Sequence, residues 1–164
     1  MTIEILHQIF LRSNSVCTDT RKVQKNDLFF ALKGENFNGN LFAQEAIAKG
    51  ASHAIIDDEN YKTTEGCILV DDVLSALQQL AAFHRRYLNI KILALTGSNG
   101  KTTTKELLHT VLSKKFKTIA TRGNLNNHIG VPLTLLNMNN STEIGIIEMG
   151  ANHLKEIELL CNIA

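Results

Sequence analysis

The stretch Leu95-Thr96-Gly97-Ser98-Asn99-Gly100-Lys101-Thr102 decides the fold of the second half of this sequence. It follows a dense apolar run at 90–96, which predicts a buried strand, and it opens a segment to about residue 115 that predicts a helix. A strand, a glycine-bearing turn and a helix N-terminus form a phosphate-binding loop, because glycines let backbone N–H groups turn towards an anion. Lys101 would reach the β- and γ-phosphates of a nucleotide, and Thr102 would place its hydroxyl on Mg²⁺.

The loop departs from the full Walker pattern at one position, because Leu95 stands where that pattern has its first glycine. The remaining motif, G-x-N-G-K-T after a strand, is still more specific than an isolated Gly-Lys-Thr. The alternative is a glycine-rich turn with a surface lysine, which requires the strand, the glycine spacing, the lysine and the threonine to coincide by chance. We therefore predict an ATP site made of Gly97, Ser98, Asn99, Gly100, Lys101, Thr102 and Thr103.

A carboxylate ends a second apolar run. Glu148 follows residues 144–147, which predict a strand to about residue 149. Ligands of parallel sheets bind outside the carboxyl ends of the strands, so Glu148 is expected at the ligand edge, where it could hold Mg²⁺ directly or through water. The alternative is an ordinary carboxylate at a strand end. His153 could also reach metal or phosphate, although a surface histidine at a helix start is an equally good interpretation.

Three amides lie within four positions in the segment Asn124-Leu125-Asn126-Asn127-His128-Ile129-Gly130. The segment falls between a strand predicted at 116–121 and an apolar helix. Such a loop suits hydrogen bonding to a ligand, but asparagine and glycine are also simply good loop residues. The residues alone leave both interpretations open.

Strands and helices alternate along the whole chain, which predicts an α/β fold with parallel pairing. In the second half only three strands are visible, so we expect an incomplete P-loop sheet with one edge unpaired and its helices uncovered. The first half predicts strands at 28–32, 53–56 and 67–70, loops at 13–26 and 33–40, and helices at 3–10, 42–49 and from Asp71 or Asp72 to about Leu88. We expect a small α/β domain at 1–88, followed by the P-loop domain at 89–164.

The composition is that of an ordinary globular chain, with 164 residues, 44% of them hydrophobic, and a formal net charge of +1. The near-zero charge argues against nucleic-acid binding, which needs clustered basic residues. Residues 91–164 carry eight Lys+Arg against five Asp+Glu, so the half with the P-loop is the positive one.

The cysteines and the N-terminus favour a cytoplasmic location. Cys17, Cys67 and Cys161 form no CxxC pair, and an odd, widely spaced set is typical of reduced thiols. No signal peptide is expected, because no basic segment followed by an apolar one opens the sequence. No apolar run is long enough to predict a membrane-spanning helix.

Four motifs, in this order, resemble the ATP-dependent Mur ligases of peptidoglycan synthesis. They are the segment 15–39, the P-loop run 96–105, GNLNNHIGVP at 123–132 and EMGANH at 148–153. The resemblance runs from about residue 15 to the end of the sequence. It implies a UDP-substrate-binding domain at 1–88 and the first part of a central ATPase domain at 89–164. The family's third domain would lie outside this sequence.

The resemblance also implies a reaction and its cofactors. ATP, with Mg²⁺, would phosphorylate the carboxylate of UDP-N-acetylmuramoyl-tripeptide to an acyl phosphate. The amine of D-alanyl-D-alanine would then attack, giving an amide, ADP and phosphate. Lys101 would clamp the β- and γ-phosphates, and Thr102 and Glu148 would hold the metal ion. Asn126 and Asn127 would lie near the transferring phosphate or the muramoyl end of the substrate.

Further residues match family motifs by position. Thr20, Arg21, Lys33 and Gly34 match positions around the family's uridine-diphosphate pocket, and His153 joins Lys101 and Glu148 as a candidate catalytic residue. The family loop that runs G-x-x-x-D-G-H differs here, because Asn38 and Asn40 replace the Asp and the His. The exchange keeps hydrogen-bonding capacity and removes a charge, which leaves the contacts of this loop open.

Two other functions stay open at this stage. A sister Mur ligase or a folylpolyglutamate-type ligase would share the P-loop, although NNHIGVP and the stretch 29–34 favour the member that adds D-alanyl-D-alanine. A non-catalytic nucleotide-binding module would use the P-loop as a switch, but a switch needs no UDP-type domain beside it. We expect the 164-residue chain to be inactive alone and the full-length form to be a monomer.

Overall fold

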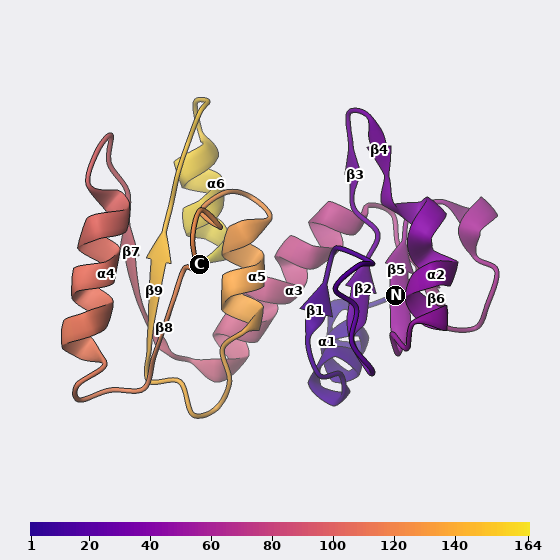
Figure 1. The fold of residues 1–164 in the computed structure, drawn as a ribbon, viewed down its shortest axis with the longest axis horizontal. Coiled ribbons are helices and arrows are strands. Elements are labelled where there is room, and N and C mark those ends of the chain that lie inside the picture. The colour runs from indigo at the N-terminus through magenta and orange to yellow at the C-terminus, as the bar shows by residue number, and fades with distance from the viewer. The chain divides into compact units, whose positions relative to one another are not determined.

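The computed structural model describes residues 1–164 and divides them into two compact units (Figure 1). The N-terminal unit is Met1–Leu77 and the C-terminal unit is Gln78–Ala164. The expected domain boundary falls at the end of α3 (Val73–Leu88), whereas the boundary between the units falls within that helix.

The second part of α3 belongs to the C-terminal unit because its side chains bond there. Gln78 Nε2 donates to the carbonyl oxygen of His128 at 3.0 Å, and His84 Nε2 lies 3.0 Å from the carbonyl oxygen of Met138. Burial lowers the pKa of His84, and the contact with the Met138 carbonyl opposes that effect. One continuous helix therefore contributes to both units.

A four-stranded parallel sheet of order β1-β2-β5-β6 forms the centre of the N-terminal unit. Its strands are β1 (Val16–Cys17), β2 (Leu28–Phe30), β5 (His53–Ile56) and β6 (Cys67–Leu69). All three β2 residues are buried, as the short apolar run predicts. On one face of the sheet, alanines of α2 (Ala43–Ala48) share a core cluster with Phe29 and Ile56.

The segment predicted as a loop at 33–40 contains regular structure. A short hairpin of β3 (Lys33–Gly34) and β4 (Phe37–Asn38) leads directly into a 3₁₀ helix, η1 (Gly39–Phe42). The unit also contains α1 (Ile3–Arg12) and a second 3₁₀ helix, η2 (Glu59–Tyr61). α1 confirms the helix predicted at 3–10; it buries Leu6 and Phe10 and leaves Ile5 exposed.

Asp57, directly after β5, ties three elements of the N-terminal unit together. Its carboxylate accepts hydrogen bonds from Lys33 Nζ and Asn40 Nδ2, both at 2.8 Å, and from the backbone N–H of Val73 at 3.2 Å. Burial opposes ionisation, but these bonds outweigh it and lower the pKa of Asp57. Of the two candidate starts of α3, Asp71 and Asp72, it is Asp72 that acts as the helix cap, because its Oδ1 accepts the Ser75 N–H at 2.6 Å.

The C-terminal unit contains a parallel sheet of order β7-β9-β8. The strands are β7 (Lys91–Leu95), β8 (Thr118–Ala120) and β9 (Ile144–Glu148). The strand predicted at 90–96 forms as β7, but the prediction that it is buried is wrong, because the last strand in the sequence takes the central place. β7 has strand neighbours on one edge only, and Leu93 is 41% exposed. β8 is the strand at the other end of the sheet, so both outer edges are unpaired, whereas the sequence predicted one unpaired edge.

Helices cover both faces of this sheet (Figure 1). α4 (Lys101–Leu112) lies on one face, and α5 (Gly130–Leu136) and α6 (Glu156–Ile163) lie on the other. The outward side of α4 is apolar, with Leu107 62% and Val111 69% exposed, as expected for a helix without a full cover. No helix of the structure is both long and apolar enough to span a bilayer.

Candidate functional site

The P-loop connects the end of β7 to the start of α4, as predicted. Gly100 is the N-cap of α4 and has φ +76°, and Gly97 has φ +154°, conformations that side-chain-bearing residues rarely adopt. A Cβ on Gly100 would meet no atom within 4 Å, so the backbone conformation, and not crowding, requires glycine. Lys101 Nζ donates to the Gly97 carbonyl at 2.6 Å, so its ammonium lies over the loop where a phosphate would bind.

Glu148 lies beside this loop because β9 pairs with β7. Leu95 and Glu148 are partners in the register, so both strands end at the same edge of the sheet. Glu148 is buried, and its Oε1 accepts hydrogen bonds from Thr102 Oγ1 at 3.2 Å and Asn126 Nδ2 at 3.0 Å. Its backbone N–H donates to Thr121 Oγ1 at 3.0 Å. The structure therefore brings together three predicted site residues from three separate motifs.

Lys105 completes this cluster, and the sequence analysis assigned it no role. It lies one turn after Thr102 on α4 and is fully buried. Its Nζ lies 3.7 Å from Glu148 Oε2 and 3.0 Å from Glu106 Oε1. The signal available in the sequence was the spacing, because residues three apart on a helix share a face.

The cluster fits a divalent cation. The Thr102 hydroxyl and the Glu148 carboxylate supply oxygen atoms, which Mg²⁺ prefers as ligands. Glu148 Oε1 accepts hydrogen bonds only from the neutral groups Thr102 Oγ1 and Asn126 Nδ2, so no cationic side chain neutralises the carboxylate on that side. Thr102 itself is exposed, so the Oε1 side of the cluster is open to a ligand.

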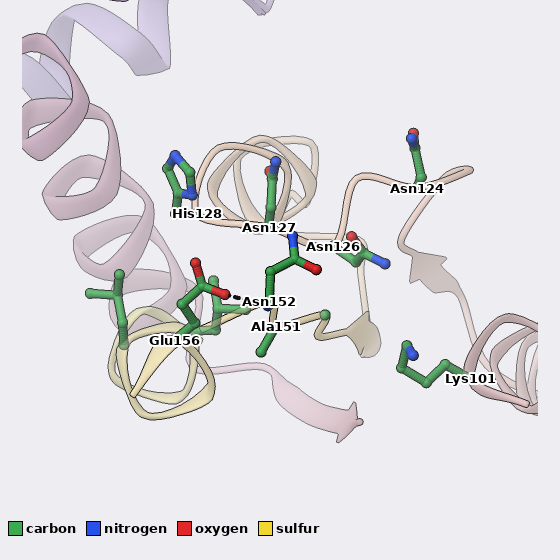
Figure 2. Close-up of a pocket in the computed structure, with 11 residues that line it drawn as sticks. Lys101, Asn124, Asn126, Asn127, His128, Ala151, Asn152 and Glu156 are labelled. Carbon is green, nitrogen blue, oxygen red and sulfur yellow. Dashed lines mark hydrogen bonds between the residues drawn. The ribbon is translucent and has the colours of Figure 1, made fainter. Parts of the chain in front are cut away.

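A pocket of about 370 Å³ opens next to Lys101 (Figure 2). Its walls come from the asparagine loop after β8 (residues 124–130), from the loop between β9 and α6, and from α6 itself. Figure 2 shows Lys101 on one side and His128 and Glu156 on the other. The lining residues are Lys101, Asn124, Asn126, Asn127, His128, Gly150, Ala151, Asn152, Glu156, Leu159 and Leu160. The asparagine loop thus faces a cavity, as a ligand-binding role requires.

Asn126 and Asn127 play different parts in this wall. Asn126 reaches Glu148, and its carbonyl accepts the Gly150 N–H at 2.8 Å. A Cβ on Gly150 would lie 3.0 Å from the Asn126 amide, so glycine allows this close approach. The Asn127 Oδ1 accepts the N–H groups of Ile129 and Gly130 at 3.1 and 2.9 Å and so caps the start of α5.

His153 does not line the pocket, and neither Lys101 nor Glu148 is bonded to it. Its backbone N–H donates to Glu156 Oε2 at 3.0 Å, next to the Asn152 N–H at 2.6 Å. Both hydrogen bonds lower the pKa of Glu156, and the bond from the Asn152 N–H has the larger effect. Glu156 and His128 are pocket residues that the sequence analysis missed, because neither stands in a spacing that carries a known chemistry.

A separate pocket of about 580 Å³ lies in the N-terminal unit. It contains the predicted residues Thr20 and Arg21, but Lys33 and Gly34 do not line it. Phe37 and Phe42 stack with ring centroids 5.4 Å apart and give the pocket an aromatic wall that the sequence analysis missed. The full lining is Thr18, Asp19, Thr20, Arg21, Phe29, Phe37, Phe42 and Glu45.

The loop that departs from the family pattern is explained by the fold. Asn40 is buried, donates to Asp57 Oδ1 and to Asn38 Oδ1, and accepts the Asp57 N–H at 3.0 Å. Its amide is therefore used within the N-terminal unit. Lys33 is likewise held by Asp57, at 2.8 Å.

Asp19 holds Arg21 at the edge of this pocket. Arg21 Nε and Nη2 donate to the two carboxylate oxygens at 2.9 and 2.8 Å, and these bonds lower the pKa of Asp19 from 3.8 to about 2. Since the folded pKa is below its ordinary value, the pair is fully formed above about pH 4 and is lost as the pH falls through 2.

We expect carboxyl carbon NMR to show Asp19 titrating near 2. Arg21→Ala should return the midpoint towards 3.8, and Arg12→Ala should leave it unchanged; a wild-type midpoint near 3.8 would contradict the pairing.

The fold and the site together define a protein of two α/β units, the second of which carries a glycine-bearing loop between a strand and a helix. The comparisons identify the family: the chain belongs to the Mur ligase family. Residues 13–85 match the model described as "Mur ligase family, catalytic domain", and residues 95–164 match "Mur ligase middle domain". The names of the similar proteins specify one ligase within this family. UDP-N-acetylmuramoyl-tripeptide–D-alanyl-D-alanine ligase of Bacillus subtilis is 45% identical over 153 residues, which are 92% of this chain and 34% of the relative.

Solved structures agree with this assignment. A crystal structure of MurF from Acinetobacter baumannii matches 99% of this chain with a TM-score of 0.87 and 37% identity, over 38% of its own length. The structure of MurF from Thermotoga maritima in complex with ADP matches 94% with a TM-score of 0.84 and 34% identity, over 36% of its length. The chain spans about a third of the length of these relatives.

Proposed function

We propose that this chain provides the UDP-substrate module and the phosphate-binding part of a ligase that joins D-alanyl-D-alanine to UDP-N-acetylmuramoyl-tripeptide. The observation that carries this proposal is that relatives with that name match both units, at up to 45% identity over 92% of the chain. A cytoplasmic location and a monomeric full-length enzyme are part of the proposal. The three cysteines are free, which accords with a reducing compartment.

In the C-terminal unit, the P-loop backbone and Lys101 would bind the phosphates of ATP. The exposed N–H groups of the loop and the start of α4 provide the anion site, and the lysine exchanges its bond to Gly97 for one to phosphate. Thr102 and Glu148 would hold Mg²⁺, which when bound neutralises phosphate charge. Phosphoryl transfer depends mainly on such positioning and charge compensation, so no covalent intermediate with the protein is required.

The pocket beside Lys101 would receive the substrate carboxylate. A carboxylate oxygen attacks the γ-phosphorus and ADP leaves. The amine of D-alanyl-D-alanine then attacks the acyl carbon, the phosphate leaves, and an amide remains. Asn126, next to Glu148 and in the pocket wall, is placed to donate to the transferring phosphate or the muramoyl end. We retain His153 as a candidate that acts only if the exposed loop between β9 and α6 moves.

The pocket of the N-terminal unit would bind the UDP end. Phe37 and Phe42 offer an aromatic surface on which a base can stack, and Arg21 and Thr20 offer donors to a diphosphate. Lys33 and Gly34 stay in the proposal as residues near this site. Lys33 would then either contact the UDP end while it stays bonded to Asp57, or exchange that bond for one to the ligand.

Thermal unfolding of the 164-residue chain tests both halves of the proposal. UDP-N-acetylmuramoyl-tripeptide and MgATP should each stabilise the chain, by about 2.7 kcal/mol at 100 times the dissociation constant. Arg21→Ala should abolish only the shift caused by the UDP ligand, and Lys101→Ala only the shift caused by MgATP. A folded chain that responds to neither ligand would overturn the proposal.

A further inference from the structure

Two residues of α4, three positions apart, reach the two oxygens of Glu148. Thr102 Oγ1 donates to Oε1 at 3.2 Å, and Lys105 Nζ lies 3.7 Å from Oε2. The spacing places both side chains on the same face of the helix, which packs against the sheet. The two oxygens of one carboxylate therefore have different surroundings.

Burial makes this difference large. Lys105 is 0% exposed and Glu148 1%, so neither charge is screened by water. Lys105 Nζ and Glu148 Oε2 have no hydrogen-bond partner, and the other carboxylate near the ammonium belongs to Glu106, at 3.0 Å. Lys105 does not line the pocket beside Lys101, so it is not placed to bind phosphate there.

The charges then decide where a cation can approach Glu148. Oε2 faces a buried ammonium, which repels a divalent cation, whereas Oε1 faces a neutral hydroxyl and a neutral amide. We propose, on the basis of the Mg²⁺ site proposed above, that Lys105 is a positioning residue. It holds the inner oxygen of Glu148 and so presents Oε1, beside Thr102, to the metal ion.

The test is ADP binding to the chain, measured by calorimetry with Mg²⁺ and with EDTA. The dissociation constant in EDTA divided by the dissociation constant with Mg²⁺ gives the contribution of the metal ion to ADP binding. Lys105→Met should reduce that ratio by about 10–100-fold, the usual effect of removing a group that orients a metal ligand, and should leave binding in EDTA unchanged. Lys114→Met, at an exposed lysine just after the same helix, should change neither value. Lys105→Arg, which keeps the charge, should recover part of the ratio.

Other results would overturn the proposal. If Lys105→Met weakens ADP binding equally with and without Mg²⁺, the lysine acts on phosphate or on the loop. If the ratio is unchanged, Glu148 needs no orientation by Lys105. If the wild-type chain binds ADP with no effect of Mg²⁺, the proposed metal site fails, and the positioning role of Lys105 fails with it. A wild-type chain that does not bind ADP fails the proposed function itself.

A second readout needs no ligand. Each single change, Lys105→Met or Glu148→Gln, leaves a buried group without its partner and should lower the unfolding midpoint. The double variant removes both members and should unfold at a higher temperature than either single variant. This comparison also decides the case in which Lys105→Met does not fold. Recovery of the fold in the double variant supports the pairing with Glu148, and failure to recover contradicts it.

Discussion

Lys101→Ala should abolish amide formation in a full-length ligase that carries this sequence. Loss of one group that stabilises the charge of the transition state costs about 10²–10³-fold in kcat, and Lys101 has no neighbouring lysine in the pocket to replace it. The Lys101 side chain bonds only to the Gly97 carbonyl among the polar contacts of the structure, so its removal should not disturb the fold. The measurement is phosphate release that depends on D-alanyl-D-alanine.

The control is Lys115→Ala, an exposed lysine in the same unit, which should retain full activity. Unchanged thermal unfolding of Lys101→Ala would show that the loss is chemical. A variant that keeps more than a tenth of the activity would contradict the role of Lys101. A protein that binds MgATP but releases no phosphate with any amine acceptor would instead favour the nucleotide-binding module.

Glu148→Gln should remove the dependence of nucleotide binding on Mg²⁺ and reduce turnover by at least about 10²-fold. A metal ion supplies several kcal/mol of charge stabilisation, and each 1.36 kcal/mol is a factor of about ten. The glutamine oxygen can still accept from Thr102 and Asn126, so the local hydrogen bonds survive. The buried Lys105 loses its buried counter-charge and keeps only the exposed Glu106, so the free energy of unfolding should also fall by about 3 kcal/mol.

Titration of Mg²⁺ at saturating ATP checks the first part, and urea unfolding checks the second. Glu158→Gln, at an exposed glutamate of α6, should change neither. Normal Mg²⁺ dependence in Glu148→Gln would exclude this carboxylate as a metal ligand. Loss of Mg²⁺ dependence without loss of stability would show that Lys105 is satisfied by Glu106 alone.

The glycine-bearing loop between β7 and α4, where we propose that phosphate binds, was predictable because its pattern is local. Gly97, Gly100, Lys101 and Thr102 follow one another, and the strand before them and the helix after them can be read from adjacent residues. Asp72 as a helix cap was predictable for the same reason. The α/β class followed from alternating short apolar runs and helical periodicity, which need no knowledge of distant contacts.

The place of each strand in a sheet was not predictable from such patterns. The run at 90–96 is apolar and predicts a buried strand, but its burial depends on which strands lie beside it. β9 enters between β7 and β8, so Glu148 becomes central and buried while Leu93 stays partly exposed. Residues 33–40 look like a loop because hairpin strands of two residues are too short to show a period.

The sequence by itself determined the α/β class, the glycine-bearing turn between a strand and a helix, and the carboxylate at a strand end. Each of these depends on neighbours within a few positions. Only the tertiary structure decided that Thr102, Asn126 and Lys105 meet at Glu148. It also decided that Asn40 donates a hydrogen bond to Asp57, and that Phe37 and Phe42 line one pocket. The physical reason is that strand order and helix packing bring residues from separate motifs together, and these contacts leave no periodicity in the sequence.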